Sequence, residues 1–510
     1  MPRLALGNTS LAGYSGDTVV VGLRPAESPK GGRRRKDAAP AAQVATGVEL
    51  DAALADEIAS LVEVLAPKTA LGSTTLAAAP AGLRARTLLL VGLGDDAPTT
   101  ETLRRAAGAA TRALPKATSV RLLLPHDGPA QLAAIAEGAL SGSYSFTAHK
   151  SADAEGGLET VEIGTTLGKE HAPKDVLARA EVLGRAVAWA RDLVNTAPNL
   201  LYPQSFADRV AEAVKASPGK VSLTVLDDED LAKGGFGGIV GVGQGSSRPP
   251  RIVQMTYTPS RSRKAPHVGL VGKGITFDTG GVCIKPAASM ATMKSDMAGA
   301  AAVAATVVAA AELEVPVAVS GYLCLAENMP GGNAQRPGDV VTMRNGMTVE
   351  ILDTDAEGRM VLADGMSLAA EQGAEVILDI ATLTGACMVA LGPDIYGVMS
   401  NDESVRDAVG VASAATDEPS WPLPLPRDLR PGLDSFVADI AHKADRMGGA
   451  LTAGIFLEEF ARTKDGETIP WAHLDIAGPS FRDGGARDHL PKGGTGVGVA
   501  TMLRYLEDLA

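Results

Sequence analysis

Residues 267–286 read HVGLVGKGITFDTGGVCIKP, an apolar run that passes directly into glycines, lysines and an aspartate. A run of this kind, ended by glycine, is typical of a strand that is buried on both faces. After this run, further apolar stretches that read as strands (PVAVSGYLCL, VEIL and VILDIATL) alternate with helical patterns near 298–312 and 358–372. This alternation predicts an α/β domain whose mostly parallel central sheet is covered by helices. In such sheets, ligands gather at the carboxyl ends of the strands.

The first third of the chain predicts a second, smaller α/β domain. From Thr87 the sequence TLLLVGLGDDAPTT reads as a strand, ETLRRAAGAATRAL as a helix and VRLLLPH as another strand. Residues 174–194 carry apolar side chains near helical spacing, and NTAPN follows as a stop signal. We therefore expect an N-terminal domain over 1–172, a linker helix over 173–196 and a larger C-terminal domain over 197–510.

Length and charge exclude several classes of protein. At 510 residues the chain is long enough for two cores, and 45% of its residues are hydrophobic. Its net charge of −13 argues against nucleic acid or an anionic membrane as the main partner. The basic run at Arg33, Arg34, Arg35 and Lys36 reads as a solvated loop. The alternative is an anion-binding patch that would give the N-terminal domain a role in binding DNA or ADP-ribose.

The expected compartment follows from cysteine usage and apolar stretches. Cys283, Cys324 and Cys387 form no C-x-x-C pair and are odd in number, which favours a reducing compartment. The longest apolar stretch, Ala298–Ala311, is too short to span a bilayer, and the N-terminus shows no signal-peptide pattern. We expect a cytoplasmic protein with no membrane partner.

Charged side chains follow the predicted strands at the points where these strands end. Three segments supply them: Lys273, Asp278 and Lys285 after the first strand, Asp296 before the alanine-rich helix, and Asp353, Asp355, Glu357 and Arg359 after VEIL. Leaving Asp353 aside, the carboxylates carry a charge of about −4, which two divalent cations would balance. A lysine can join such a ligand set only as the neutral amine, whereas Arg359 stays a fixed positive charge. The sequence therefore predicts a two-metal site of the kind that activates water for hydrolysis. Mn²⁺, Zn²⁺ and Mg²⁺ are all compatible with it.

Other interpretations of these residues stay open. Acidic residues before a helix are common N-caps, so capping could explain any one of them alone. Asp353–Asp364 imitates a calcium-binding loop, but Asp364 replaces the final Glu and a predicted strand precedes the loop. Gly92-Leu93-Gly94 resembles a lenient dinucleotide fingerprint, but acidic residues follow where the pyrophosphate would lie. His473, in WAHLDIAG, reads as a histidine packed within a strand.

Hydrolases of other classes are disfavoured by absent motifs. The sequence contains no H-E-x-x-H, which a zincin needs, and no G-x-S-x-G nucleophile elbow. The leading rival among enzymes is a different two-metal hydrolase, such as a phosphoesterase.

With these motifs the chain resembles the leucyl aminopeptidase family. VGKGITFDTGGVCIKP, MKSDMAGAAAV and DTDAEGRMVLAD are similar to the signature blocks of that family. The likeness continues through ENMPGGNAQRPGD, IATLTGA and WAHLDIAGP and covers roughly residues 180–510. The first 170 residues or so resemble only the general layout of the family's macro-domain-like N-terminal α/β domain. The chain departs from the family at Asp353, where Asn is frequent, and HKADRMGGALTAG matches loosely.

The resemblance implies a dinuclear-metal aminopeptidase. It would hydrolyse the N-terminal residue, preferably leucine or another apolar residue, from peptides with a free N-terminus, by means of a metal-activated bridging water. Asp278 and Glu357 would bridge two Mn²⁺ or Zn²⁺ ions, Lys273 and Asp296 would complete one metal site, and Asp355 would complete the other.

The resemblance also implies roles for further residues. Lys285 and Arg359 would be catalytic, with Arg359 holding a bicarbonate ion that acts as the general base. Substrate contacts would come from four residues: Met293, Thr382, Leu383 and Gly385. Members of the family assemble as homohexamers, and we expect that assembly here by resemblance alone.

Overall fold

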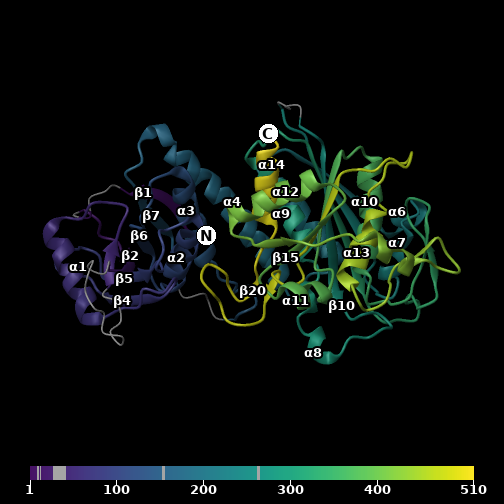
Figure 1. Ribbon diagram of the computed structural model, residues 1–510, viewed down its shortest axis with the longest axis horizontal. Helices are drawn as coiled ribbons and strands as arrows, with labels where there is room; N and C mark the ends of the chain where they lie inside the picture. Colours follow the sequence, from purple (N-terminus) through teal and green to yellow (C-terminus); the bar gives the residue numbers. More distant parts are fainter. Residues whose placement is uncertain (8–10, 12, 27–41, 152–155, 261–264) are drawn as a thin grey trace. The chain divides into compact units, whose positions relative to one another are not determined.

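The computed structural model describes residues 1–7, 11, 13–26, 42–151, 156–260 and 265–510 (Figure 1). Arg33–Lys36 lies outside the described residues. The chain packs as two compact units, Met1–Arg185 with Gly484–Lys492, and Ala186–Asp483 with Gly493–Ala510. Helix α4 (Pro173–Asn195) contains the point at which the first unit gives way to the second. The domain boundaries expected from the sequence, at 172 and 196, stay a prediction.

The first unit is built on a seven-stranded sheet. Its strands, in spatial order, are β1 (Arg3–Gly7), β7 (Thr160–Gly164), β6 (Ser119–Leu122), β2 (Thr18–Pro25), β5 (Thr87–Gly92) and β4 (Thr74–Ala78), with β3 (Ala42–Ala45) also paired to β2. Only the β4–β5 and β2–β3 pairs are antiparallel. The helices are α1 (Ala52–Leu65), α2 (Thr100–Arg112) and α3 (Pro129–Gly142). The strand–helix–strand unit expected from Thr87 onward corresponds to β5, α2 and β6.

Glycines let α2 and α3 pack with their backbones close together. A Cβ atom on Gly138 would lie 2.1 Å from the carbonyl oxygen of Arg104, so no larger residue fits. The segment Gly484–Lys492 packs on the same helices. A Cβ atom on Gly108 would lie 2.3 Å from Cβ of His489, and the Ser141 hydroxyl donates to the His489 carbonyl at 2.8 Å. A piece of chain from near the C-terminus is therefore part of the first unit.

The second unit contains an eight-stranded mixed sheet. Its strands, in spatial order, are β16 (Ser420–Pro422), β15 (Tyr396–Ser400), β18 (Trp471–Asp475), β14 (Val376–Ala381), β10 (Val268–Asp278), β11 (Val319–Asn328), β9 (Arg251–Tyr257) and β8 (Val221–Leu226). The four central strands, β18 to β11, run parallel as the alternation of strands and helices predicts. Antiparallel pairs occur toward both edges, where β15 meets β18 and where β9 meets β11 and β8.

Two helices cover opposite faces of the central strands. Gly272 of β10 lies under α9 (Ala298–Glu312), since a Cβ atom there would be 2.6 Å from Cα of Ala300. The preceding residue, Val271, contacts α10 (Gly358–Glu371), since a Cβ atom on Gly365 would lie 2.8 Å from Val271 Cγ1. Because successive residues of a strand point to opposite faces, α9 and α10 sandwich the sheet.

The remaining elements surround this sandwich. The other helices of the second unit are α5 (Pro203–Ala216), α6 (Asp228–Lys233), α7 (Gly237–Gly243), α8 (Ala287–Met290), α11 (Gly385–Leu391), α12 (Glu403–Thr416), α13 (Gly449–Glu458) and α14 (Val499–Asp508). Small sheets are formed by β12 (Val340–Thr342), β13 (Thr348–Glu350) and β17 (Ile440–Ala441), and by β19 (Phe481–Arg482) and β20 (Gly493–Gly494). Within the described ranges, one helical stretch, Met293–Glu312, is long and apolar enough to cross a membrane. Its most apolar window is 89% buried within the protein, as in a core helix.

Candidate metal centre

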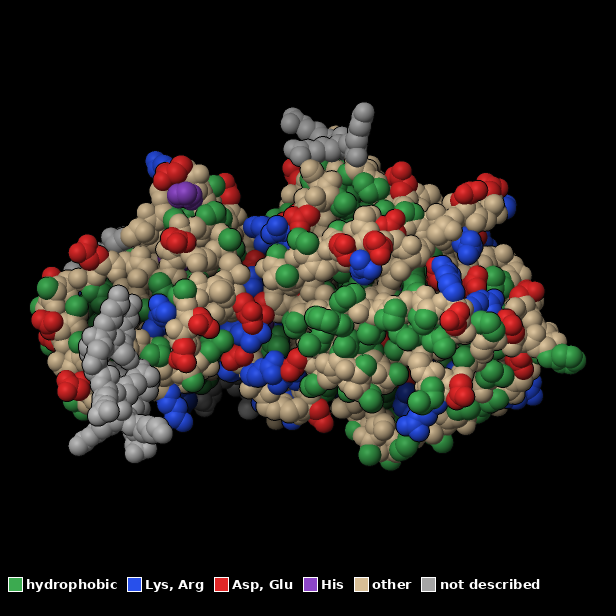
Figure 2. All heavy atoms as spheres, viewed as in Figure 1, with side chains coloured by type: hydrophobic (Ala, Val, Ile, Leu, Met, Phe, Trp, Pro, Cys, Tyr) green, Lys and Arg blue, Asp and Glu red, His purple; other side chains and the backbone are tan. Residues whose placement is uncertain are grey.

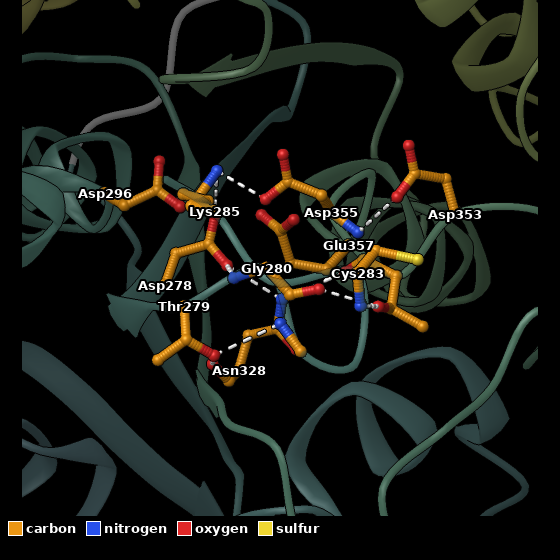
Figure 3. A network of polar contacts seen from close by, with 12 residues as sticks. Asp278, Thr279, Gly280, Cys283, Lys285, Asp296, Asn328, Asp353, Asp355 and Glu357 are labelled. Carbon is orange, nitrogen blue, oxygen red and sulfur yellow. Dashed lines mark hydrogen bonds and ion pairs between the residues drawn. The ribbon is translucent and has the colours of Figure 1, made fainter. Parts of the chain in front are cut away.

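The end of one central strand and the segments before two helices bring the predicted acidic ligands together (Figure 3). Asp278 is the last residue of β10, and Asp296 lies two residues before α9. Asp355 and Glu357 stand between β13 and the first residue of α10. One carboxylate oxygen each from Asp278, Asp355 and Glu357 lies within 4.8 Å of the others, which is close enough to share a metal ion. Asp278 and Glu357 are almost fully buried, whereas Asp355 is exposed.

Neither of the two helices that follow these acids is capped by an acidic side chain. Glu357 occupies the N-cap position of α10 without a side-chain hydrogen bond to the helix, and Met297 precedes α9 in the same way. Simple capping therefore does not explain the cluster. The calcium-loop interpretation also fails, because the strand β13 precedes the loop. Asp364 is completely buried in α10, where its carboxylate accepts from the Ile239 and Arg344 amides at 2.9 Å.

The Lys273 side chain lies at the buried end of the cluster. Its Nζ is 2.8 Å from Asp296 Oδ2 and from Glu357 Oε1, and it donates to the Thr382 carbonyl at 2.9 Å. Gly358 makes room for the side chain, since a Cβ atom there would lie 2.7 Å from Cδ and Cε of Lys273. The glycine that opens α10 is thus required by the lysine that reaches the acids.

Lys285 closes the cluster from the opposite side. Its Nζ lies 2.8 Å from Asp278 Oδ2 and 2.5 Å from Asp355 Oδ1. The loop that carries Lys285 turns through Gly280 and Gly281, whose φ angles of +85° and +65° favour glycine. The loop thereby brings Lys285 back over the end of its own strand.

Burial and crowding shift the pKa values of these groups. Burial raises the pKa of Asp278 to about 8, and the charges of Glu357 and Asp296 add to the effect. Burial likewise raises the pKa of Asp296 to about 6. For Glu357, burial would raise the pKa, but Lys273 and Lys285 outweigh it, so this pKa is lowered. The carboxylates are therefore too crowded for two lysines to neutralise, and Asp278 holds a proton at pH 7 unless further positive charge is present.

The donor set fits divalent cations. Glu357 Oε2 is buried and accepts no hydrogen bond from any residue that the structure describes. Asp296 Oδ2 also makes no hydrogen bond of good geometry, although Lys273 Nζ is 2.8 Å away. Carboxylate oxygens are hard ligands that suit Mn²⁺, Zn²⁺ and Mg²⁺, and such ions would balance the excess negative charge. The residues present therefore suit the predicted metal pair.

Arg359 is a buried cation next to the cluster, in the first turn of α10. Its Nη1 donates to the His442 carbonyl at 2.9 Å, and its Nε has no hydrogen-bond partner within the part of the chain that the structure describes. Burial lowers the pKa of Arg359 to about 10, so the guanidinium stays charged at neutral pH. A buried guanidinium with an unpartnered N–H is suited to hold an anion.

The four residues expected to contact substrate lie in two segments. Met293, half-buried, stands in the turn before Asp296, and the other three follow β14. The Thr382 hydroxyl donates to Asp296 Oδ1 at 2.7 Å, so this residue holds a predicted metal ligand. The Leu383 amide donates to Asp475 Oδ1 at 3.2 Å, and Gly385 is exposed at the start of α11.

Sequence reasoning did not single out four residues that contact these segments: Asn328, Thr354, His442 and Lys443. The Thr354 hydroxyl donates to the Gly280 carbonyl at 2.6 Å and accepts from the Cys283 amide at 2.9 Å. His442 Nε2 lies 2.8 Å from the Asp353 carbonyl. Only the position of Asn328, three residues after the predicted strand PVAVSGYLCL, offered a signal in the sequence.

Asp353 lies beside the cluster but outside the group of three acids. Its Oδ1 accepts from the Asp355 amide at 3.0 Å (Figure 3). Its Oδ2 pairs with Lys443 Nζ. Burial would raise the pKa of Asp353, but the hydrogen bond from Lys443 outweighs it and lowers that pKa. His473 is packed within β18, as expected, with its Nδ1 2.6 Å from Asp379 Oδ1.

Comparisons with known proteins identify the family. The model of the cytosol aminopeptidase family's catalytic domain matches residues 188–503, and that of its N-terminal domain matches residues 25–153. The probable cytosol aminopeptidase of Streptomyces avermitilis is 47% identical over 99% of this chain and 98% of the relative. That of Micrococcus luteus is 52% identical over 83% of this chain and 85% of the relative.

Solved structures agree with this result. The bottromycin maturation enzyme BotP in complex with Mn superposes with a TM-score of 0.83 at 35% identity, covering 97% of this chain and 99% of that one. A mutant of tomato leucine aminopeptidase gives a TM-score of 0.85 at 28% identity, covering 100% and 97%. Because both domains match over nearly their whole length, the chain belongs to the cytosol aminopeptidase family and is a metallo-aminopeptidase, a hydrolase.

Proposed function

We propose that this enzyme removes the N-terminal residue, preferably leucine or another apolar residue, from peptides with a free amino terminus. The observation that carries the proposal is the meeting of Asp278, Asp355 and Glu357 at the end of β10 and the start of α10, with a buried Glu357 oxygen that has no partner among the described residues. Lys273 and Asp296 lie against the same group and complete the proposed ligand set. A cation pair held there would polarise a carbonyl group and lower the pKa of a water molecule.

The metal is proposed to be Mn²⁺, with Zn²⁺ as the alternative. An oxygen-rich site with one amine suits either ion, and a similar solved structure is described as a complex with Mn. For Lys273 to act as a ligand, its amine must lose a proton. Its present neighbours, Asp296 and Glu357, raise its pKa despite burial, so metal binding would have to displace that proton.

Lys285 and Arg359 are proposed as the catalytic residues. Lys285 Nζ lies at the open side of the acids, where it can stabilise the negative charge that develops on a substrate carbonyl oxygen. Removing a donor of this kind costs roughly 10²- to 10³-fold in kcat. Arg359 would hold a bicarbonate ion that takes up a proton during hydrolysis. Its Nε makes no hydrogen bond to the described residues, so this N–H can donate to the ion. Met293, Thr382, Leu383 and Gly385 are proposed to line the site for the substrate, and the apolar Met293 and Leu383 support an apolar preference.

The decisive experiment compares three substrates with metal-depleted and Mn²⁺-reloaded enzyme. Leucine p-nitroanilide should be cleaved only after reloading, whereas N-acetyl-leucine p-nitroanilide and p-nitrophenyl phosphate should not be cleaved. Asp278→Asn should lose at least about 10²-fold in kcat/KM. Asp353→Asn is the matched control, because Asp353 pairs with Lys443 outside the acid group, and it should stay within a few-fold of wild type. Phosphatase activity, or full peptidase activity of Asp278→Asn, would refute the proposal.

The homohexamer and the cytoplasmic location are also proposed. Curated relatives are named cytosol aminopeptidases, which supports the location. Large apolar side chains are exposed on the second unit, among them Val389, Phe436 and Met447, and Figure 2 shows apolar side chains gathered on one of its faces. Exposed apolar surface of this kind is often covered by another subunit. Light scattering after size-exclusion chromatography should give six times the mass of the chain.

A further inference from the structure

Asn328 occupies a central place beneath the acid group. It is the last residue of β11 and is the register partner of Asp278, the last residue of β10. Its side chain is buried, with 4% of the residue exposed. Neither the family match nor the ligand set assigns it a role.

The amide of Asn328 joins two segments that carry proposed ligands. Its Nδ2 donates to Asp278 Oδ1 at 2.7 Å and to the Thr354 carbonyl at 3.0 Å. Both partners are acceptors, so the orientation of the amide is settled by the hydrogen bonds. Thr354 directly precedes Asp355, so one side chain holds the end of β10 against the loop that carries two further acids.

These bonds decide which oxygen of Asp278 faces the cluster. Asp278 Oδ1 accepts from Asn328 Nδ2 and from the Gly280 amide at 2.8 Å. Asp278 Oδ2 lies on the other side, 2.8 Å from Lys285 Nζ. A carboxylate's terminal torsion is soft, so without the amide donor Oδ1 would keep only the Gly280 amide, and the plane of this carboxylate would be less firmly fixed.

We propose that Asn328 is a positioning residue that fixes the carboxylate of Asp278, and its distance from Asp355, for metal binding. The inference rests on the proposed metal site. Groups that hydrogen-bond to metal ligands orient them, and their loss commonly weakens metal affinity about 10- to 100-fold. The alternative is that Asn328 only satisfies buried polar groups at the end of a strand. Its replacement would then lower stability but leave metal binding unchanged.

The test measures the Mn²⁺ affinity of the full chain. The protein is first dialysed against a chelator, and Mn²⁺ is then titrated in while electron paramagnetic resonance monitors the unbound ion. Asn328→Ala removes both hydrogen bonds that the amide donates, and Asn328→Leu removes them in a side chain of similar size without adding charge. Asn401→Ala is the matched control. Asn401 likewise follows a strand of the second unit and makes two side-chain hydrogen bonds: its Nδ2 donates to the Ile469 carbonyl, and its Oδ1 accepts from the Trp471 amide.

Both Asn328 variants should bind Mn²⁺ about 10- to 100-fold more weakly, whereas Asn401→Ala should bind it like wild type. With leucine p-nitroanilide, kcat should recover at saturating Mn²⁺ and KM should stay unchanged. If Asn328→Ala does not fold, Asn328→Leu decides the question. Wild-type Mn²⁺ affinity in either folded Asn328 variant, or an equal loss in Asn401→Ala, would overturn the inference. A wild-type protein that binds Mn²⁺ but cleaves no peptide would end the proposed function, while the comparison of Mn²⁺ affinities would still judge Asn328.

Discussion

Replacing Gly358 with alanine should destabilise the enzyme, although alanine is the better helix former. Gly358 is the first residue of α10, and an added Cβ atom would lie 2.7 Å from Cδ and Cε of Lys273 and 2.8 Å from its Nζ. Favourable carbon–carbon contacts are about 3.5–4.0 Å, so the lysine would have to move by roughly 1 Å. It cannot swing into solvent, because it is 3% exposed and its ammonium group is held by Asp296, Glu357 and the Thr382 carbonyl.

The expected magnitude comes from two opposing effects. Overpacking a buried site costs about 1–3 kcal/mol, and helix propensity returns at most about 1 kcal/mol. The free energy of unfolding should therefore fall by about 0–2 kcal/mol relative to wild type, and by about 1–3 kcal/mol relative to a glycine-to-alanine variant that gains helix propensity without overpacking. Since Lys273 is a proposed ligand, Mn²⁺ affinity should also fall, by about 10-fold or more.

Urea unfolding monitored by circular dichroism, together with Mn²⁺ titration, would measure both effects. Gly449→Ala is the matched control, because Gly449 opens α13 and its added Cβ atom would find only Ala386 Cβ, at an ordinary 3.7 Å. That variant should match or slightly exceed the wild-type stability. A Gly358→Ala enzyme as stable as Gly449→Ala, with unchanged Mn²⁺ affinity, would show that the crowding at Lys273 is not real.

Three further predictions follow from neighbouring groups. Thr382→Val removes the hydroxyl donor to Asp296 but keeps the carbonyl that accepts from Lys273, so Mn²⁺ affinity by titration should fall about 10-fold with little change in fold. Burial lowers the pKa of His442 to about 4, so between pH 6.5 and 4 the unfolded chain binds a proton that the folded chain does not. Stability measured by urea midpoints should therefore fall as pH falls, by about 1.4 kcal/mol per unit from this group, and His442→Asn should flatten that slope. Because the pKa of Asp278 is about 8 without metal, Mn²⁺ binding at pH 7 should release protons, detected by calorimetry in buffers of different ionisation enthalpy, and should release fewer at pH 9.

The alternation of strands and helices predicts much of the acid group, because Asp278 ends a buried strand and Asp296 stands just before the helix that follows it. The expectation that VEIL is a strand of the central sheet is wrong, since β13 lies in a small separate sheet with β12 and β17. Asp355 and Glu357 reach the site because they precede α10, which leads into β14 and so begins at the edge of the sheet where β10 ends.

Contacts that depend on the exact register of the strands could not be predicted from the sequence. The bond from Asn328 to Asp278 needs a shift in register between Ile275 and Phe277, which no composition signals. His442 reaches Arg359 across 83 residues of sequence. The pairing of Asp353 with Lys443 likewise turns an expected extra acid into half of an ion pair.

Thr382 shows a different limit of sequence patterns. A motif indicates that a residue belongs to the site, but it does not distinguish a group that touches substrate from one that holds a ligand. The structure shows its hydroxyl on Asp296 and its carbonyl on Lys273. Contact with substrate remains a prediction for this residue.

The incorporation of Gly484–Lys492 into the first unit has a consequence for biosynthesis. A ribosome makes the N-terminal 185 residues long before it reaches His489, yet α2 and α3 pack directly against that histidine. Domains usually fold as they emerge, but this one must wait for the last twentieth or so of the polypeptide before its surface is complete. A fragment ending at residue 185 would leave Gly108 and Ser141 uncovered, and it should be less resistant to proteases than the same residues in the full-length enzyme.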